Sequence, residues 1–317
     1  MNTQTSNRRA VIYCTDEKML PVAVYSARNA ALNNKNNDYD ILICSLHPLD
    51  IPDEVLSLGV RSEVLDLEAT ISEMGLAHKW LPKTAFLRLW LSERLGDQYD
   101  RILYLDSDTN VVTDRISGLF DVDMGPHPIG AVRDIAQWFN PKRMAFDFTA
   151  RNIRGQKIFN SGVQLIDTQR FLAMDCLEKM LDVHRAPEPT LQNDQSLLNL
   201  GLMGNIAELH PYWNWQWTSR QPYISALVSP NIIHYVGIKK PWSKEVFVET
   251  NYSFELYRSY NSFVAQYFPD HTDDFPVLEK PKRKWFKSLG HMSVQIFPML
   301  ALYRYFRRFE SELDVLT

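Results

Sequence analysis

The sequence predicts an α/β fold, with a parallel or mixed sheet covered by helices on both faces. Short apolar runs alternate along the chain with segments whose apolar residues recur at helical spacing. Such alternation is typical of sheets whose strands are connected by helices. The 317 residues are enough for one large domain, or for one domain with appendages. Because ligands of such sheets bind beyond the carboxyl ends of the strands, residues that follow a strand are the first candidates for a site.

The N-terminal part of the chain is expected to contain four strands and three helices. The first strand, Ala10–Cys14, is an apolar run that leads directly into Thr15-Asp16. Small and apolar residues at helical spacing predict a helix over Met19–Leu32. The other elements are strands at Tyr39–Leu46, Ser62–Leu67 and Arg101–Leu105, and helices at Pro52–Leu58 and Thr84–Leu95.

The alternation continues through the rest of the chain. Strands are expected at Pro128–Val132, Phe159–Asp167, Ile206–Leu209 and Asn231–His234, and helices at Gln169–His184 and Asp194–Asn199. The clearest shift of composition falls near residue 270, where acidic, proline-containing sequence gives way to basic and aromatic residues. The sequence therefore predicts a sheet-containing domain over residues 1–270 and a small helical tail over 271–317.

Charge and cysteine content narrow the function classes. The net charge of −4 provides no basic field for nucleic acid, so we expect no nucleic-acid partner. The three cysteines show neither a disulfide framework nor zinc-site spacing, which favours buried thiols in a reducing compartment. The polar N-terminus and the lack of a long apolar stretch predict a cytoplasmic protein.

The C-terminal tail carries positive charge on an otherwise acidic chain. Between Lys280 and Arg308 there are eight Lys and Arg residues and no Asp or Glu, so the remaining residues carry a net charge of −12 against −4 for the whole chain. Basic residues alternate with aromatic ones at Lys280–Lys287 and again at Tyr303–Arg308. Such a segment suits the surface of an anionic membrane. The alternative is a C-terminal helix that packs on the domain with its lysines in solvent.

Two aspartates follow the strand that ends at Leu105. Asp106 and Asp108 are placed to project from the carboxyl edge of the sheet. Carboxylate oxygens are the ligands that hard divalent cations prefer, and a diphosphate would supply further oxygens. The pair thus predicts a metal site for a nucleotide diphosphate, although turn-forming aspartates in a loop remain an alternative.

Three further groups of residues follow later elements. His234 ends an apolar run and is followed by Gly237 and Lys240, which suits a metal ligand beside a phosphate-binding cation. The alternative is a structural histidine at the end of a strand. Asn160 lies in Phe-Asn-Ser-Gly-Val at the start of a strand, where it serves either a turn or a sugar hydroxyl. Asp194-Gln195 opens a helix and serves either as its start or as part of a pocket.

Together, in this order, the four groups resemble glycosyltransferase family 8, which includes retaining lipopolysaccharide galactosyl- and glucosyltransferases and glycogenin. The matching motifs are Leu103–Asp108, Phe159–Val163, Asp194-Gln195 and His234–Trp242. The resemblance spans roughly Val11 to Trp242. It implies a GT-A fold, a nucleotide-binding α/β domain of the Rossmann type.

The resemblance also implies a role for each matched residue. The cofactor would be Mn²⁺, with Mg²⁺ as the alternative, and the donor would be a UDP-hexose. The metal would be held by Asp106, Asp108 and His234, and the diphosphate would contact Gly237 and Lys240. Ser107 would be a further donor-binding residue. The uridine would lie on Cys14, Thr15 and Asp16. The donor sugar would meet Arg88, Asn160 and Asp194, with Gln195 beneath the anomeric carbon.

The implied activity is transfer of galactose or glucose from a UDP-sugar to a saccharide or glycolipid acceptor, in lipopolysaccharide or surface glycan synthesis. No carboxylate pair is apparent for a double displacement, so the resemblance favours attack by the acceptor on the same face of the sugar. A sugar-nucleotide pyrophosphorylase is an alternative, but the sequence after the first strand lacks the glycine-rich loop expected of one. A catalytically silent sugar-binding protein is another, and it would be expected to lose part of the Asp106, Asp108 and His234 set.

Overall fold

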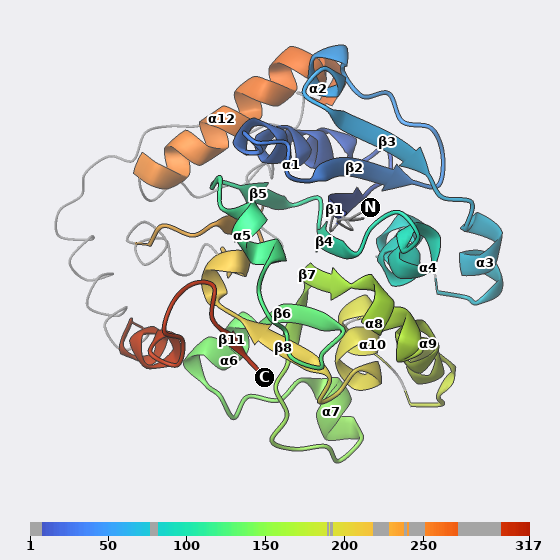
Figure 1. Cartoon of the computed structure of the whole chain (residues 1–317), viewed down its shortest axis with the longest axis vertical. Helices are drawn as coiled ribbons and strands as arrows, with labels where there is room; N and C mark the ends of the chain where they lie inside the picture. The colour runs from blue at the N-terminus through green and yellow to red at the C-terminus, as the bar shows by residue number, and fades with distance from the viewer. Residues whose placement is uncertain are drawn as a thin grey trace, which may run out of the picture.

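The computed structural model describes residues 8–76, 82–188, 190, 193–217, 228–237, 240, 251–271 and 299–317. These residues form a mixed eight-stranded sheet and a separate three-stranded sheet, surrounded by helices (Figure 1). The predicted α/β fold with a mixed, helix-flanked sheet is confirmed.

The large sheet has the strand order β11-β8-β6-β7-β4-β1-β2-β3. Its strands are β1 Arg9–Cys14, β2 Asp40–Ser45, β3 Val60–Val64, β4 Arg101–Leu105, β6 Ile129–Arg133, β7 Phe159–Asp167, β8 Ile206–Leu209 and β11 Val315–Leu316. The strands β3, β2, β1 and β4 are parallel to one another. Because β7 runs antiparallel to both of its neighbours, β4 and β6, the start of β7 lies near the end of β4.

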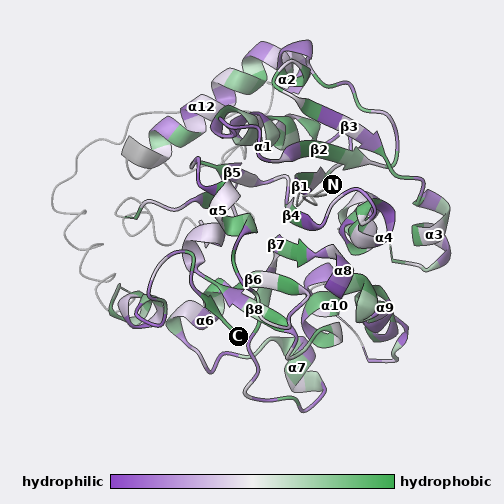
Figure 2. Cartoon of the chain, viewed as in Figure 1, coloured by the Kyte–Doolittle hydropathy of each residue, from purple (hydrophilic) through white to green (hydrophobic). Residues whose placement is uncertain are grey.

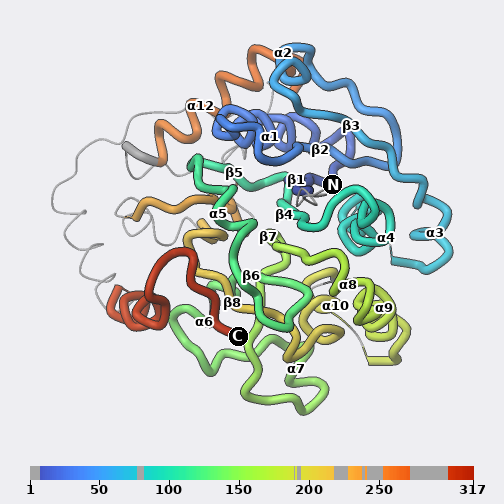
Figure 3. Tube along the Cα trace, in the orientation of Figure 1, coloured from blue at the N-terminus to red at the C-terminus, as the bar shows by residue number. Residues whose placement is uncertain are grey.

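Hydrophobic side chains form a core on each face of this sheet, because successive residues of a strand point to opposite sides. One core contains Val11 and Tyr13 of β1 together with residues of α1 (Leu20–Asn33) and α12 (Asn251–Tyr267). Figures 1 and 3 show α12 beside α1, where the rings of Tyr25 and Tyr260 lie 5.2 Å apart. The second core contains Ile12 of β1. Figure 2 shows that the strands β2 and β7 are largely hydrophobic.

The remaining helices are short. The second core contains residues of α3 Glu68–Glu73, η1 Lys83–Trp90, α4 Leu91–Leu95, α8 Thr168–Ala173, α9 Cys176–Arg185 and α10 Asn193–Gly201. The other helical elements are α2 Asp53–Leu56, α5 Ile116–Phe120, α6 Ile135–Phe139, α7 Phe146–Ala150, η2 Pro211–Asn214 and η3 Pro269–His271.

The small sheet brings together parts of the chain that are far apart in sequence. It consists of β5 (Thr109–Val111), β10 (Ile232–His234) and β9 (Trp215–Gln216), in the order β5-β10-β9. β5 and β10 are antiparallel, and their register places His234 opposite Thr109. Since β5 begins directly after Asp108, this pairing carries His234 to the carboxyl end of β4.

Three predicted elements differ from the structure. The segment predicted as one helix over Thr84–Leu95 is a 3-10 helix up to Trp90 and α-helical only afterwards. Every residue from Thr84 to Trp90 is buried, so this segment has no solvent face of the kind that an amphipathic α-helix presents. The helix predicted over Gln169–His184 is two helices, because Asp175 adopts the left-handed conformation with φ 50°. β3 spans Val60–Val64 rather than the predicted Ser62–Leu67.

The described end of the C-terminal tail is built into the sheet and the core. Residues 299–306 are helical, and β11 pairs antiparallel with β8 at the edge of the large sheet (Figure 1). Tyr305 is buried in the core and Phe306 packs against it, so these two rings of the predicted cluster do not face a membrane. The basic cluster at 280–287 lies outside the described residues. No described helix is long and apolar enough to span a bilayer.

A buried glutamate ties this C-terminal helix to the sheet. Glu208 of β8 is fully buried, and its carboxylate lies 2.9 Å from Arg133 Nε, 3.2 Å from Lys157 Nζ and 2.8 Å from Arg308 Nη1. The Tyr305 hydroxyl donates a further hydrogen bond of 2.9 Å. Burial opposes ionisation, but Arg133 and Arg308 outweigh it and lower the pKa of Glu208 below its ordinary value.

We predict that Glu208→Ala destabilises the fold by about 3–5 kcal/mol, because it leaves Arg133 buried without its anion. Urea unfolding measures the loss. Because the folded pKa of Glu208 is lowered, its contribution is fully present above the unfolded pKa of ~4.3 and disappears as the pH falls through the folded value. Glu255→Ala is the control, since Glu255 forms an exposed pair with Arg258 and should cost below about 1 kcal/mol. Equal losses in both variants would contradict the role of Glu208.

Candidate active site

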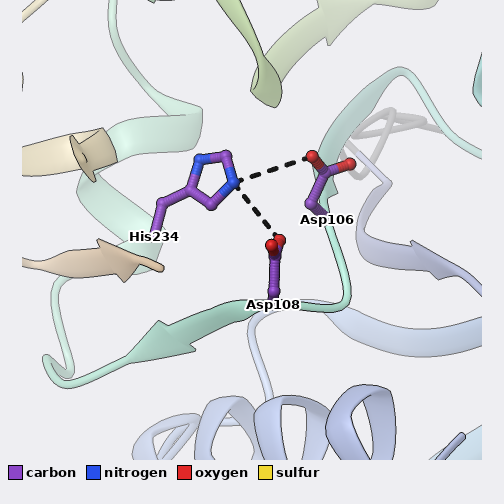
Figure 4. A group of neighbouring side chains, drawn as sticks. All are labelled: Asp106, Asp108 and His234. Atoms are coloured by element: carbon purple, nitrogen blue, oxygen red, sulfur yellow. Dashed lines mark ion pairs between the residues drawn. The ribbon is translucent and has the colours of Figure 1, made fainter. Parts of the chain in front are cut away.

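Three potential metal ligands meet at the carboxyl end of β4. Asp106 and Asp108 follow this strand directly, and His234 arrives on β10 (Figure 4). His234 Nε2 lies 3.2 Å from Asp108 Oδ1 and 3.8 Å from Asp106 Oδ2. One ligand atom from each residue lies within 4.8 Å of the others. The structure thus brings together the three residues that the sequence indicates as metal ligands.

The imidazole of His234 is oriented by a buried amide. Its Nδ1 lies 3.0 Å from Asn214 Oδ1, and Asn214 Nδ2 donates to Asn160 Oδ1 at 2.8 Å. The Asn214 carbonyl oxygen accepts from Nδ1–H, and this contact directs Nε2 toward the two aspartates, where a metal-binding nitrogen would lie. Histidine ligands are usually held in this way. No sequence motif points to Asn214, because its role arises only when η2 is folded against β10.

Asp106 is oriented by two groups on its other side. Its Oδ1 accepts from the Tyr104 hydroxyl at 2.6 Å and lies 2.9 Å from Arg88 Nη2. The Oδ2 atom is the one nearer to His234. The sequence predicts Tyr104 only as part of a buried strand, and its place two residues before Asp106 is the signal that both side chains leave the same face.

Arg88 joins the two acidic motifs. Its Nη1 lies 3.0 Å from Asp194 Oδ2 and 3.3 Å from the Ser161 carbonyl, while its guanidinium lies 4.6 Å from the centre of the Tyr104 ring. Burial disfavours its charge, but Asp106 and Asp194 more than compensate and raise the pKa of Arg88. Burial raises the pKa of Asp194, and Arg88 offsets part of that rise. Arg88 is thus a permanent cation that links Asp106 to α10.

Lys240 lies against the second aspartate. Its ammonium group donates to Asp108 Oδ2 and to the Tyr235 carbonyl. Gly237, between His234 and Lys240, has a φ of 88°, a conformation that favours glycine. Burial disfavours the Asp108 carboxylate, but Lys240 and His234 outweigh it and hold the pKa of Asp108 well below its usual value. The other residues of this motif, 238–239 and 241–242, lie outside the described residues.

The space between the ligands exists because residue 162 is a glycine. A Cβ atom there would lie 2.2 Å from His234 Cε1 and 2.7 Å from Asp106 Oδ2. Gly162 lies within β7, and its carbonyl accepts from the Asp106 backbone amide at 2.8 Å. The glycine therefore serves the close approach of two ligands rather than a turn. Two carboxylates and an imidazole around such a space fit Mn²⁺, and Mg²⁺ as the harder alternative.

One cavity adjoins the potential metal ligands, and a second cavity adjoins the first. A cavity of about 210 Å³ is lined by Cys14, Thr15, Asp16, Arg88, Ser107 and Asp108, among others. A larger one, of about 470 Å³, shares Thr15 and Asp16 with it and extends over the ends of β1 and β2. Both lie beyond the carboxyl ends of the parallel strands, where ligands of such sheets bind. Burial raises the pKa of Cys14 to about 12, so its thiol lines the cavity uncharged.

Asn160 and Gln195 lie in one hydrogen-bond network. Gln195 Oε1 accepts from Asn160 Nδ2 at 3.2 Å, and Gln195 Nε2 donates to Asp134 Oδ2 at 3.2 Å. Asn160 Oδ1 also accepts from Asn214, so Asn160 braces both Gln195 and the residue that orients the histidine. Asp134 follows β6 directly, and its place at the end of a strand is the signal that sequence inspection missed.

Comparison with known proteins connects this geometry to a family. A family model described as glycosyl transferase family 8 matches residues 10–246. General stress protein A of Bacillus subtilis (strain 168) is 27% identical over 231 residues, which are 67% of this chain and 78% of that protein. Lipopolysaccharide 1,2-glucosyltransferase of Escherichia coli (strain K12) is 25% identical over 260 residues, covering 77% of this chain and 75% of that protein. Five streptococcal relatives are longer, and the matches span 22% to 58% of their length.

The fold is also similar to that of solved structures. The galactosyltransferase LgtC, crystallised with donor and acceptor sugar analogs, matches with a TM-score of 0.62 at 17% identity. The match covers 82% of this chain and 96% of LgtC. At this identity the likeness concerns the fold, which is the GT-A arrangement that the sequence motifs imply.

We predict that Gly162→Ala weakens Mn²⁺ binding about 10- to 100-fold, because the added methyl group pushes His234 and Asp106 apart. Titration followed by the electron paramagnetic resonance signal of free Mn²⁺ measures the affinity. Gly118→Ala is the matched control, since its new Cβ would lie 3.5 Å from the nearest atom, an ordinary contact. Unchanged Mn²⁺ affinity in folded Gly162→Ala would show that the metal does not bind between these ligands.

Proposed function

The chain belongs to glycosyl transferase family 8, and on this premise we propose that it transfers a galactosyl or glucosyl group from a UDP-sugar to a saccharide acceptor, with retention of the anomeric configuration. The observation that carries the proposal is the group of Asp106, Asp108 and His234 beside the cavities at the strand ends. A catalytically silent sugar-binding protein would have no need to keep three ligand atoms within 4.8 Å of one another.

In the proposed complex, the donor lies across the carboxyl ends of the strands. The uridine occupies the region of Thr15 and Asp16, which line both cavities. The diphosphate lies near the metal ligands, where Lys240 supplies a second cation. The sugar extends toward Arg88 and Gln195. The pairing of Arg88 with Asp106 supports this placement, because it sets the sugar-binding residues next to the metal ligands.

The proposed reaction breaks the bond between the anomeric carbon and the phosphate oxygen. When bound, the metal supplies Lewis-acid stabilisation of the leaving diphosphate. Lys240 stabilises the same developing negative charge, and the Gln195 amide oxygen faces the positive charge that develops on the sugar ring. The acceptor hydroxyl forms the new bond on the same face, and its proton passes to the departing phosphate oxygen. This step needs no carboxylate as a nucleophile.

We predict that the enzyme turns over a UDP-hexose only with Mn²⁺ or a similar divalent ion, and that Asp108→Ala lowers the rate on the order of 10³-fold or more. The loss follows from removal of one metal ligand. UDP release from a panel of UDP-sugars measures it. Asp114→Ala is the control, because Asp114 lies on the surface and pairs with Lys35. Turnover of Asp108→Ala near the wild-type rate, with metal present, would rule out the metal assignment.

We further propose that the acceptor is a glycolipid of lipopolysaccharide or surface glycan synthesis, reached from the cytoplasmic face of a membrane. The basic cluster at 280–287 supports this, together with Tyr303, Arg304 and Arg307, which are exposed on and just after the C-terminal helix. Each basic residue near an anionic surface contributes ~1 kcal/mol. The Escherichia coli relative is a lipopolysaccharide glucosyltransferase, which agrees with such an acceptor.

The membrane proposal predicts that the full chain co-sediments with anionic liposomes at low salt and is released at high salt, because salt screens the attraction. The comparison is a variant in which every lysine and arginine of 280–287 is replaced by glutamine, which leaves β11 in place. Weaker sedimentation of this variant at low salt is expected. Equal sedimentation of both proteins would show that the cluster does not dock the enzyme on lipid.

A further inference from the structure

The side-chain amide of Gln195 is held between groups of opposite character. Its Oε1 accepts from Asn160 Nδ2 at 3.2 Å and from the Ser161 backbone amide at 3.4 Å. Its Nε2 donates to Asp134 Oδ2 at 3.2 Å. Reversal of the amide would place its NH₂ group against two donors and its oxygen against a carboxylate. All three contacts would then be repulsive, so these neighbours select one orientation.

The same order of donor and acceptor continues through a chain of side-chain amides that leads to His234. Asn160 Oδ1 accepts from Asn214 Nδ2 at 2.8 Å, and Asn214 Oδ1 lies 3.0 Å from His234 Nδ1. From His234 to Asp134, every hydrogen bond of this chain therefore points toward Asp134. An ionised carboxylate only accepts hydrogen bonds, so it can end such a chain in one direction alone. Asp134 thus determines which end of each side-chain amide in this chain donates and which end accepts.

Asp134 is itself fixed by its surroundings. Its Oδ1 caps helix α6 by accepting from the Ala136 amide at 2.9 Å, and its own backbone amide donates to the Ile158 carbonyl at 2.8 Å. The buried side chain of Gln216 holds the two neighbouring residues, since Oε1 accepts from the Ile135 amide at 2.8 Å and Nε2 donates to the Arg133 carbonyl at 2.7 Å. One oxygen of the Asp134 carboxylate therefore accepts from the helix backbone, and the other accepts from Gln195.

The orientation of the Gln195 amide determines whether its oxygen or its NH₂ group faces Asp106 and the other candidate metal ligands. Ser161, whose backbone amide contacts Oε1, lies next to Gly162, and its carbonyl accepts from Arg88 at 3.3 Å. Arg88 in turn is paired with Asp106. The negative end of the amide thus points to the side of the metal ligands, and its positive end points to Asp134.

We propose that Asp134 is a positioning residue that keeps the Gln195 oxygen directed toward the anomeric carbon of the donor. The inference rests on the proposed function and deepens it. Breaking the bond to the diphosphate leaves positive charge on the sugar ring, and an amide oxygen stabilises that charge best when it is already oriented. A reversed amide would present its positive end instead. Asp134 acts through Gln195 and requires no contact with the sugar.

The first test is Asp134→Asn. Asparagine keeps the helix cap, since Asn and Asp cap helices about equally well, but it presents an NH₂ group to Gln195. We expect kcat to fall about 10- to 100-fold, while the dissociation constant of the UDP-sugar stays within about twofold. The matched control is Asp167→Asn. Asp167 also caps a helix, accepting from the Arg170 amide at 3.0 Å, but it lies at the other end of β7 and its replacement should leave kcat unchanged.

A double-mutant cycle separates positioning from a general structural effect. Gln195→Glu alone sets a second carboxylate against that of Asp134. In Asp134→Asn combined with Gln195→Glu, the new amide donates to the new carboxylate, and the donors of Asn160 and Ser161 keep an acceptor. We expect the double variant to lose about tenfold less in kcat than the product of the two single losses, since the residues act as one pair. Independent, multiplying losses would overturn the proposal, as would an Asp134→Asn effect confined to the KM of the acceptor.

A second readout does not depend on turnover. In enzyme labelled with ¹⁵N-glutamine, the Gln195 side-chain amide is identified by its loss in Gln195→Glu. Its NH₂ signal should shift in Asp134→Asn and stay in place in Asp167→Asn. If the wild type turns over no UDP-sugar, the proposed function fails while this shift still reports the contact. If the Gln195 NH₂ signal does not shift in Asp134→Asn, the positioning role is refuted even in an active enzyme.

Discussion

The short pairing of β10 with β5 is the contact on which the site depends. It joins three residue pairs and places His234 opposite Thr109, beside the aspartates that follow β4. A hydrogen bond from the Tyr235 amide to the Asp108 carbonyl, 2.9 Å long, extends this pairing. On the other side of β10, the Trp217 amide donates to the His234 carbonyl at 2.7 Å and extends the pairing with β9. The buried strand β4 positions two of the three candidate ligands, Asp106 and Asp108, and this small sheet delivers the third, His234, from a remote part of the chain.

Around this contact, opposite charges and oriented amides balance the buried carboxylates. Arg88 compensates Asp106 and Asp194, and Lys240 lies on Asp108. The amide chain from His234 to Asp134 then connects the third candidate metal ligand with Gln195, the residue beneath the proposed sugar position. One ordered network thus links two parts of the proposed reaction, the leaving group and the sugar. Preorganised groups of this kind stabilise developing charge without reorganisation during the reaction.

The sequence predicts the bounds of several strands well, and with them the residues that follow those strands. β4, β7 and β8 begin and end where their apolar runs do, and Asp106 and Asp108 follow from one of those runs. The 3-10 winding around Arg88 escapes prediction, because the sequence pattern predicts a helix there and does not distinguish a 3-10 helix from an α-helix. Asn214 and Asp134 escape it for another reason. Their roles depend on partners that the fold brings near, and the sequence around an isolated amide or carboxylate does not indicate which residue it will contact.

Metal-dependent transfer of a UDP-bound hexose is the central claim that we make for this chain. UDP release by the wild-type enzyme tests that claim most directly, measured with UDP-galactose and UDP-glucose, first with a chelator and then after Mn²⁺ is restored. We expect no release with the chelator, recovery with Mn²⁺, and faster release when a saccharide acceptor is present. Release that persists undiminished in the chelator, or no release from either donor at saturating Mn²⁺, would contradict the claim.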